Sequence, residues 1–161
     1  KEFNLSHCGM FAMDTMRMEK GYLHWGHDIS PEENQYEAGL KFAISFKKSI
    51  NFVGKKIIDK IKNGKIKKRM TMFTLKNSKP GFPLLLHDEP IYCDGKIVGR
   101  TTSGNYSFNY KKNMSFGYIN LVSPIEELTK KTLYIEVEKK KYEAVIQTKA
   151  LHDSENKVLK S

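Results

Sequence analysis

Apolar side chains recur at helical spacing near the N-terminus and at two-residue spacing further along the chain. Two adjoining helical faces result, one with Phe11, Thr15, Met18 and Tyr22 and the other with Ala12, Met16, Glu19 and Leu23. We therefore expect a helix over residues 1–21, with Asn4 or Ser6 as its N-cap. Gly21 follows Lys20 and suits a left-handed C-terminal cap.

Glu19 is the one charged residue that extends the second apolar face. Burial of an unpaired carboxylate costs several kcal/mol, so a buried Glu19 needs a partner. Arg17 is two positions away and points to another side of the helix. Three arrangements remain open: a cation from another segment, a ligand that offers two adjacent N–H groups, or a last turn that lifts the carboxylate into water.

The next stretch predicts one strand and one helix. Leu40, Phe42, Ile44 and Phe46 alternate with Lys41, Ala43 and Ser45, which is typical of a half-buried strand. A helix follows Gly54, with Ile57, Ile58 and Ile61 on its inner face, and it ends at Asn63-Gly64.

From Lys65 onward, short alternating segments separated by turn signals predict an antiparallel barrel. Asp94-Gly95 is typical of a tight hairpin turn within residues 90–99. Strands at Leu133–Val137 and Tyr142–Ile146 form another hairpin, with Lys139–Lys141 as its basic tip. The expected fold class is α+β, with a helix-containing part over residues 1–64 and the antiparallel β-barrel over residues 65–161.

A length of 161 residues is enough for one domain or two small subdomains. No apolar run reaches membrane-spanning length, and we expect no membrane partner. Cys8 and Cys93 have no metal-ligand spacing and indicate reduced thiols and a cytoplasmic location. The chain begins at Lys1 without an initiator methionine, so we expect it to be an excised piece of a longer polypeptide.

The net charge of +10 comes almost entirely from lysine, because the only arginines are Arg17, Arg69 and Arg100. Scattered lysines indicate a solvated surface, whereas nucleic-acid surfaces favour arginine with interleaved aromatics. We expect no nucleic-acid partner; a non-catalytic basic β-barrel that binds RNA is the alternative.

His24, His27 and Asp28 fall in a predicted loop and resemble part of a metal site. No further ligand set with suitable spacing accompanies them, so we expect no metal. The structural alternative is that Trp25 packs while the histidines and Asp28 hydrogen-bond the loop backbone.

Several motifs together resemble one family. They are MRMEKGYLHWGHDI with YEAGLKFAI in residues 16–44, Phe52-Val53-Gly54-Lys55, Gly95–Gly99, Thr102–Ser107 and Ser115–Ile119. This set is similar to the folate-binding domain of dimethylglycine and sarcosine dehydrogenases, which is shared with the glycine-cleavage T-protein, an aminomethyltransferase. The family usually has Thr-Pro before Glu-Ala-Gly-Leu, where this chain has Gln35-Tyr36. The tail over residues 150–160 resembles the dehydrogenase branch.

The resemblance implies tetrahydrofolate as the cofactor and assigns Glu19 to the pterin ring. It places Tyr36 near the same pocket, and helical geometry adds Met16. Lys47 or Lys48 would meet the glutamate tail of the folate; Lys48 is the residue we select. The catalytic Asp of the family lies in an earlier segment that has no match here, so we assign no catalytic residue.

The expected function is that of a fragment of an enzyme that passes a one-carbon unit from an N-methylated amine to tetrahydrofolate. Its partners would be folate, that one-carbon unit and the rest of the parent polypeptide. FAD would belong to a missing N-terminal domain if the dehydrogenase interpretation is right. The alternative within the superfamily is a glycine-cleavage T-protein fragment, and the isolated fragment is expected to be inactive.

Overall fold

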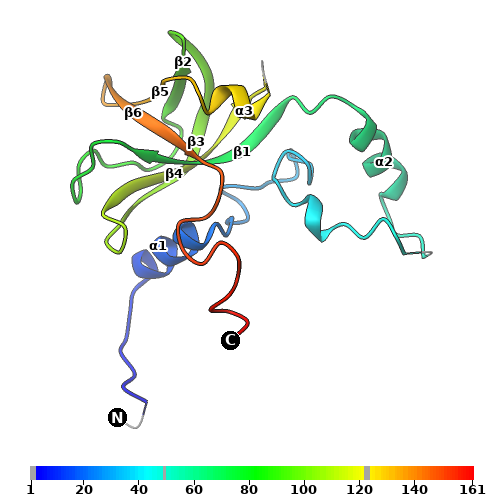
Figure 1. The fold of residues 1–161 in the computed structure, drawn as a ribbon, viewed down its shortest axis with the longest axis horizontal. Coiled ribbons are helices and arrows are strands. Elements are labelled where there is room, and N and C mark those ends of the chain that lie inside the picture. The colour runs from blue at the N-terminus through cyan, green and yellow to red at the C-terminus, as the bar shows by residue number, and fades with distance from the viewer. Residues whose placement is uncertain (1–2, 49, 122–123) are drawn as a thin grey trace.

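The computed structural model describes residues 3–48, 50–121 and 124–161. Six antiparallel strands close a barrel in the order β1-β4-β3-β2-β5-β6 (Figure 1). The strands are β1 (Lys68–Leu75), β2 (Pro90–Cys93), β3 (Lys96–Ser107), β4 (Lys112–Asn120), β5 (Leu133–Val137) and β6 (Lys140–Gln147). The helices are α1 (Met10–Lys20), α2 (Lys55–Asn63) and α3 (Ile125–Leu128), with a short 3-10 helix η1 at Lys41–Ala43. The predicted α+β class with a C-terminal antiparallel barrel is confirmed.

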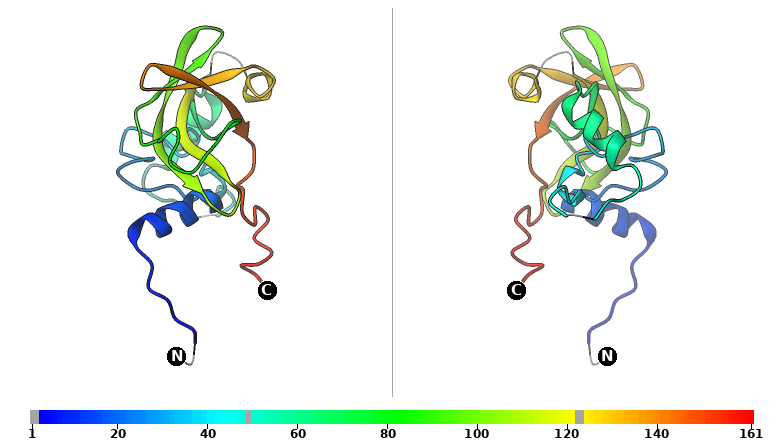
Figure 2. Two further views of the ribbon diagram at one scale, coloured as in Figure 1. Left: turned by 90° about the vertical axis from the view of Figure 1, so that its left-hand side faces the viewer. Right: turned by 90° about the vertical axis from the view of Figure 1, so that its right-hand side faces the viewer.

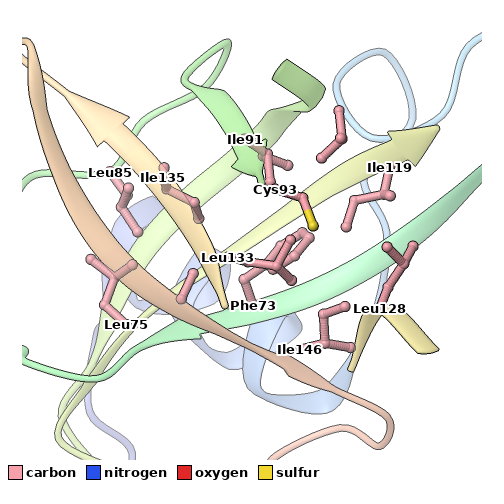
Figure 3. Packing of buried hydrophobic residues seen from close by; sticks show 12 residues of the cluster. Phe73, Leu75, Leu85, Ile91, Cys93, Ile119, Leu128, Leu133, Ile135 and Ile146 are labelled. Atoms are coloured by element: carbon pink, nitrogen blue, oxygen red, sulfur yellow. The ribbon is translucent and has the colours of Figure 1, made fainter. Parts of the chain in front are cut away.

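The barrel is built around alternating apolar positions that point to a common interior. Phe73 and Leu75 lie two residues apart on β1, so their side chains share the inner face. They pack with Ile91, Leu133 and other buried residues in one cluster (Figure 3). β1 pairs with β4 along most of its length and with β6 from Met72 onward, which closes the barrel.

Both predicted hairpins form, although one turn is displaced. Asp94 and Gly95, both with positive φ, connect β2 to β3 as expected. In the second hairpin the turn residues are Glu138 and Lys139, with φ of 50° and 63°. Lys140 and Lys141 therefore belong to β6 and not to a basic tip, because two positive-φ residues complete a two-residue turn.

The predicted strand over residues 40–46 is wrong. The segment contains η1, and its backbone bonds are local, from Ala43 N–H to the Leu40 carbonyl and from Ile44 N–H to the Lys41 carbonyl. Phe42 is 86% exposed. The alternating pattern does not form a strand here because the six strands of the closed barrel already pair with one another and leave no free edge to bond with.

α1 is shorter than predicted. It begins at Met10 after an N-cap at Gly9, and neither Asn4 nor Ser6 caps it. Its C-terminal stop at Gly21 is as expected, with φ of 80° and a bond from the Gly21 N–H to the Met18 carbonyl. α1 lies against β3 and β4, where Met18 packs on Met114 and Phe116 (Figure 2).

α2 lies beside the barrel, outside the closed sheet (Figure 1). It ends at Asn63 with Gly64 as its C-cap, as predicted. Of its predicted inner face, Ile58 is buried, whereas Ile57 is 64% exposed. No helix in the described ranges is long and apolar enough to cross a lipid bilayer.

Replacement of Gly104 by alanine should destabilise the barrel. A Cβ at this position would lie 2.4 Å from the backbone carbon of Leu85, and that residue is itself buried. Such overpacking costs about 1–3 kcal/mol, measured as a lower midpoint of denaturant-induced unfolding. Gly64→Ala is the matched control, because its nearest neighbour would lie 3.4 Å away. Equal midpoints for the two variants would contradict this packing.

Candidate functional site

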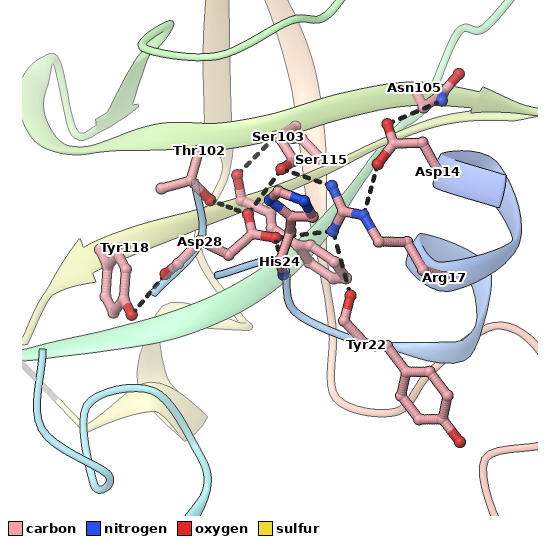
Figure 4. Close-up of polar contacts among 11 residues, drawn as sticks. Asp14, Arg17, Tyr22, His24, Asp28, Thr102, Ser103, Asn105, Ser115 and Tyr118 are labelled. Atoms are coloured by element: carbon pink, nitrogen blue, oxygen red, sulfur yellow. Dashed lines mark hydrogen bonds and ion pairs between the residues drawn. The ribbon is translucent and has the colours of Figure 1, made fainter. Parts of the chain in front are cut away.

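A buried ion pair joins α1 to the loop that follows it (Figure 4). Arg17 Nη1 lies 2.8 Å from Asp28 Oδ2, and the Asp28 side chain is fully buried. Asp28 Oδ2 also accepts a hydrogen bond from the His24 N–H, and Oδ1 accepts from the hydroxyls of Thr102 and Ser103. Four donors from three segments therefore surround one carboxylate.

The remaining N–H groups of the Arg17 guanidinium donate hydrogen bonds to other residues. Its Nε donates to Asp14 Oδ1 at 2.5 Å, its Nη1 also donates to the Tyr22 carbonyl, and its Nη2 donates to Ser103 Oγ. Arg17 thus lies between two carboxylates, and the planar fork of donors suits this arrangement. The Asp14–Arg17–Asp28 cluster carries one net negative charge, with Asp14 at its solvent-facing end.

The barrel contributes to the same cluster through strands β3 and β4. Thr102 and Ser103 lie within β3, where a bulge separates Thr101 from Ser103. The bulge places two adjacent hydroxyls on Asp28. The Tyr118 hydroxyl donates to the backbone carbonyl of Asp28 at 2.9 Å. The sequence motif therefore has a structural role in joining the two parts of the chain.

Glu19 is buried, with 3% of its surface exposed. The Ser107 hydroxyl donates to Oε1 at 2.6 Å, and the Asn109 amide donates to Oε2 at 2.9 Å. Both donors come from the end of β3 and the turn that follows it. Within the described residues Glu19 makes no ion pair, so a buried charge is held by neutral donors alone. Among the described residues Glu19 therefore meets no cation from another segment and is not lifted into water, and the alternative of a ligand with two adjacent N–H groups stays a prediction.

The other predicted site residues occupy different environments. Met16 is 53% exposed on the side of α1 away from the barrel. Tyr36 is buried, its hydroxyl has no hydrogen-bond partner among the described residues, and burial followed by the nearby charge of Asp59 raises its pKa. Lys47 and Lys48 are exposed. No hydrogen bond within the described ranges joins Glu19 to any of them.

The loop histidines do not assemble a metal site in the part of the chain that the structure describes. His24 and His27 lie with their ring centroids 4.8 Å apart, and Asp28 is bonded to Arg17 instead. The expected backbone bond from this loop to Asp28 is present at His24. The expectation that Trp25 packs is wrong, because its side chain is 67% exposed.

Two grooves flank the point where the loop meets β3. The first encloses about 460 Å³ between α1, the loop histidines, residues 84–87 and β3. Its walls are largely apolar, and the polar groups beside the histidines are Asp14, Arg17, Thr102, Ser103 and Asn105. The second, of about 470 Å³, is more polar and is lined by Glu33, Lys68, Arg100 and Tyr118 among others. Glu19 lines neither groove.

Charge interactions order the second groove. Burial alone would raise the pKa of Glu33, but hydrogen bonds from Lys68 and Ser30 outweigh it and hold the pKa below its ordinary value. Lys68 also lies over the Tyr118 ring, 4.7 Å from its centroid. Burial, and next the charge of Glu33, raises the pKa of Tyr118, so its phenol stays protonated and donates to Asp28.

The C-terminal tail closes on the last turn of α1. Lys20 Nζ donates to the Asp153 carboxylate at 2.8 Å and to the Asp153 carbonyl. The His152 N–H donates to the Glu19 carbonyl. The Asp153 carboxylate also accepts hydrogen bonds from the backbone N–H groups of Lys157 and Val158, which fixes the shape of the tail.

These features define a class of protein in which a helix-containing segment is bonded to a closed antiparallel barrel. The GCVT N-terminal domain matches residues 1–48, and the glycine cleavage T-protein C-terminal barrel domain matches residues 68–153. The chain therefore belongs to the glycine-cleavage T-protein (GCVT) family.

Two similar curated proteins come from different branches of this family. Human mitochondrial dimethylglycine dehydrogenase is 33% identical over 148 residues, which are 91% of this chain and 16% of that protein. Aminomethyltransferase from Symbiobacterium thermophilum is 33% identical over 119 residues, 73% of this chain and 30% of that protein. The chain thus spans less than a third of either relative.

The fold agrees with this family. A crystal structure of the glycine cleavage system aminomethyltransferase T from Bartonella henselae superposes with a TM-score of 0.74 at 18% identity, over 89% of this chain and 38% of that one. Both the α1 segment and the barrel therefore have the arrangement of a known fold.

Removal of the cation at Arg17 should strongly destabilise the protein. Arg17→Met leaves Asp28 buried without a cation, a loss of about 3–5 kcal/mol in the free energy of unfolding. The double variant with Asp28→Asn should recover part of this loss, which a double-mutant cycle measures. Lys131→Met, which breaks an exposed pair with Asp94, is the control and should cost less than about 1 kcal/mol. Additive single effects would contradict the coupling.

Acid should release the C-terminal tail. The hydrogen bond from Lys20 holds the pKa of Asp153 at about 2, below the ordinary 3.8. A depressed folded-state pKa stabilises the docked tail above the ordinary pKa, and this contribution is lost as the pH falls from 3.8 toward about 2. Hydrogen exchange of residues 151–161 should accelerate over that window. Asp153→Asn should remove the pH dependence, whereas Glu155→Gln in the same tail should retain it.

Proposed function

We propose that this chain is the C-terminal, tetrahydrofolate-binding part of an enzyme that transfers a one-carbon unit from an N-methylated amine. Tetrahydrofolate, when bound, supplies the nitrogen that accepts that unit. The chain itself contributes binding and orientation, and the transfer requires polypeptide outside these residues.

The observation that carries this proposal is the buried charge of Glu19. Neutral donors at Ser107 and Asn109 hold the carboxylate without cancelling its charge. The pterin edge offers an amino group and an adjacent ring N–H, which match a carboxylate in a charge-assisted pair. A carboxylate has about four acceptor positions, and two protein hydrogen bonds leave positions for such a ligand.

Access to Glu19 depends on the turn after β3. At 3% exposure the carboxylate is covered, so the pterin would displace the Asn109 amide from Oε2. Phe108 beside it is 71% exposed, so little packing opposes such a movement. The competing function for Glu19 is purely structural, as a clamp that holds this turn on α1.

The remaining residues of the proposed site have supporting roles. The buried Tyr36 hydroxyl has no hydrogen-bond partner among the described residues, and it would form one hydrogen bond with a ligand that reaches it. An exposed lysine at position 48, or its neighbour Lys47, would attract the anionic glutamate tail. Met16 would offer an apolar contact from the outer side of α1.

Two activities are compatible with the family. In the dehydrogenase type, a flavin domain elsewhere in the parent protein would oxidise the amine, and in the aminomethyltransferase type no flavin takes part. Identities of 33% to both relatives do not separate them. We favour the dehydrogenase type because the tail and the His-Trp-Gly-His-Asp-Ile loop resemble that branch.

A chimera tests the proposed role of Glu19. In it, this chain replaces the matching 148 residues of human dimethylglycine dehydrogenase. Glu19→Gln should weaken tetrahydrofolate binding about tenfold or more, because a charge-assisted pair becomes a neutral one. Calorimetric titration measures the affinity.

Asn109→Ala separates the two roles of Glu19. If the pterin displaces the amide, this variant binds tetrahydrofolate at least as tightly as the unmodified chimera. If Glu19 is only a clamp, Glu19→Gln and Asn109→Ala lower the unfolding midpoint alike and leave the affinity unchanged, which would remove Glu19 from the site.

A further inference from the structure

The positive net charge of this protein is concentrated in one segment. Residues 41–69 contain eleven lysines and arginines and a single carboxylate, Asp59, whereas the rest of the chain carries seventeen basic and seventeen acidic residues. The whole net charge of +10 therefore comes from 29 residues. A lysine-rich composition alone would raise the charge along the entire chain, so it does not account for this placement. We call residues 41–69 the basic segment.

The basic segment is exposed, and little of its charge is neutralised within the described chain. It contains η1 and α2 and lies to one side of the barrel before it enters β1 (Figure 1). Nine of its eleven basic residues are exposed. Among the residues that the structure describes, Lys68, which pairs with Glu33, is the only one of the eleven in an ion pair. A surface with an excess of one charge attracts a partner of the opposite charge.

Exposed aliphatic side chains lie among these lysines. Val53, directly before the N-cap of α2, is fully exposed, Ile57 in the first turn of α2 is 64% exposed, and Ile50 is 77% exposed. Lys56 is next to Ile57 in sequence, and Lys60 lies one turn further along the same helix. Aliphatic side chains in water beside lysines suit a partner that is anionic outside and apolar inside.

The family match does not include this surface. The matched segments are residues 1–48 and 68–153, so Ile50, Val53, Ile57 and the lysines of α2 lie outside both of them. Membership of the GCVT family therefore assigns no role to α2.

We propose that the basic segment docks on an anionic lipid bilayer. Its lysines contact the headgroups, and Val53 and Ile57 enter the boundary between the headgroups and the acyl chains. Basic amphipathic helices bind membrane surfaces in this way without crossing them. This mode of binding needs no membrane-spanning helix, and none is found in the described ranges.

The chemistry favours a lipid surface over a nucleic acid. Arg69 is the only arginine of the basic segment, and arginine is the side chain that binds phosphate groups bidentately. Nucleic-acid bases stack on aromatic rings. Of the described apolar side chains in this segment that are more than half exposed, only Phe42 is aromatic, and the other three are aliphatic. The proposal rests on charge and exposure and not on folate binding, so either can fail without the other.

Vesicle co-sedimentation of the full 161-residue chain tests the proposal. Phosphatidylcholine vesicles that contain about 30% phosphatidylglycerol should bind the chain about tenfold more tightly, or better, than pure phosphatidylcholine vesicles. Replacement of two exposed lysines of α2, by Lys56→Gln with Lys60→Gln, should weaken binding to the anionic vesicles about tenfold or more, because each basic residue at such a surface contributes about fivefold.

The matched control removes the same charge elsewhere. Lys139→Gln with Lys140→Gln changes two exposed lysines of the β5–β6 hairpin, on the side of the barrel away from α2 (Figure 1). Because salt screens distant charges, this pair should change the affinity about twofold at most. The unfolding midpoints of both double variants should equal that of the unmodified chain, since all four side chains are exposed.

A fluorescence measurement tests the apolar part of the contact. Trp25 is the only tryptophan, so Val53→Trp in a Trp25→Phe background places the one indole beside α2. Its emission should shift to shorter wavelength on anionic vesicles, because the indole leaves water. Ile97→Trp in the same background, at a 62% exposed position of the β2–β3 hairpin, is the control and should not shift.

Four results would overturn the proposal. They are binding without preference for anionic vesicles, equal losses of affinity from the two lysine pairs, an unshifted emission from the Val53→Trp variant on the vesicles, and RNA oligonucleotides that bind more tightly than anionic vesicles. The last result would make a nucleic acid the partner of the basic segment.

Discussion

The Arg17–Asp28 pair is the contact on which the arrangement of this protein depends. Taking both charges out of water offsets much of their attraction, so the pair adds little net stability compared with an apolar contact. Its value is in specificity. Helix α1, the loop at His24 and strand β3 each supply donors to Asp28, and only one placement of the three satisfies them together. The loss of either partner leaves a buried charge, so alternatives to this placement are costly.

That constraint makes the barrel the support of residues 3–48, which belong to the segment that the GCVT N-terminal domain matches. The barrel has a cluster of buried apolar residues from all six strands or their flanking segments, whereas residues 3–48 bury three apolar side chains. Three consecutive residues at the end of α1 make three separate contacts. Met18 packs in a buried apolar cluster with barrel residues, Glu19 accepts hydrogen bonds from Ser107 and Asn109, and Lys20 pairs with Asp153 in the tail. The last turn of α1 is therefore rigidly placed. Contacts with residues far away in the sequence therefore determine the position of any ligand-binding residue on this turn.

Sequence reasoning succeeded where structure is local and failed where it depends on distant partners. The Asp94-Gly95 turn, the Gly21 cap and the alternation in β1 each follow from neighbouring residues, and each is present. Residues 40–46 alternate equally well, but no strand in the barrel remains to pair with them. The role of Asp28 was missed because its hydroxyl partners lie 74 and 75 residues away. The adjacent hydroxyls of Thr102-Ser103 were a signal, since two such donors suit one carboxylate.

Asp14, Glu19 and Asp28 show how neighbouring groups decide what a carboxylate can bind. Asp28 is neutralised by Arg17 and fully buried, so it has no capacity left for a ligand. Asp14 is one third exposed, and solvent screens its charge. Of these three, Glu19 combines burial with neutral donors, so its charge is neither paired with a cation nor solvated within the described residues. A group with two N–H donors gains most from such a carboxylate, because the low local dielectric strengthens a charge-assisted hydrogen bond. The same burial restricts entry, so binding at Glu19 must be coupled to movement of the turn at Asn109.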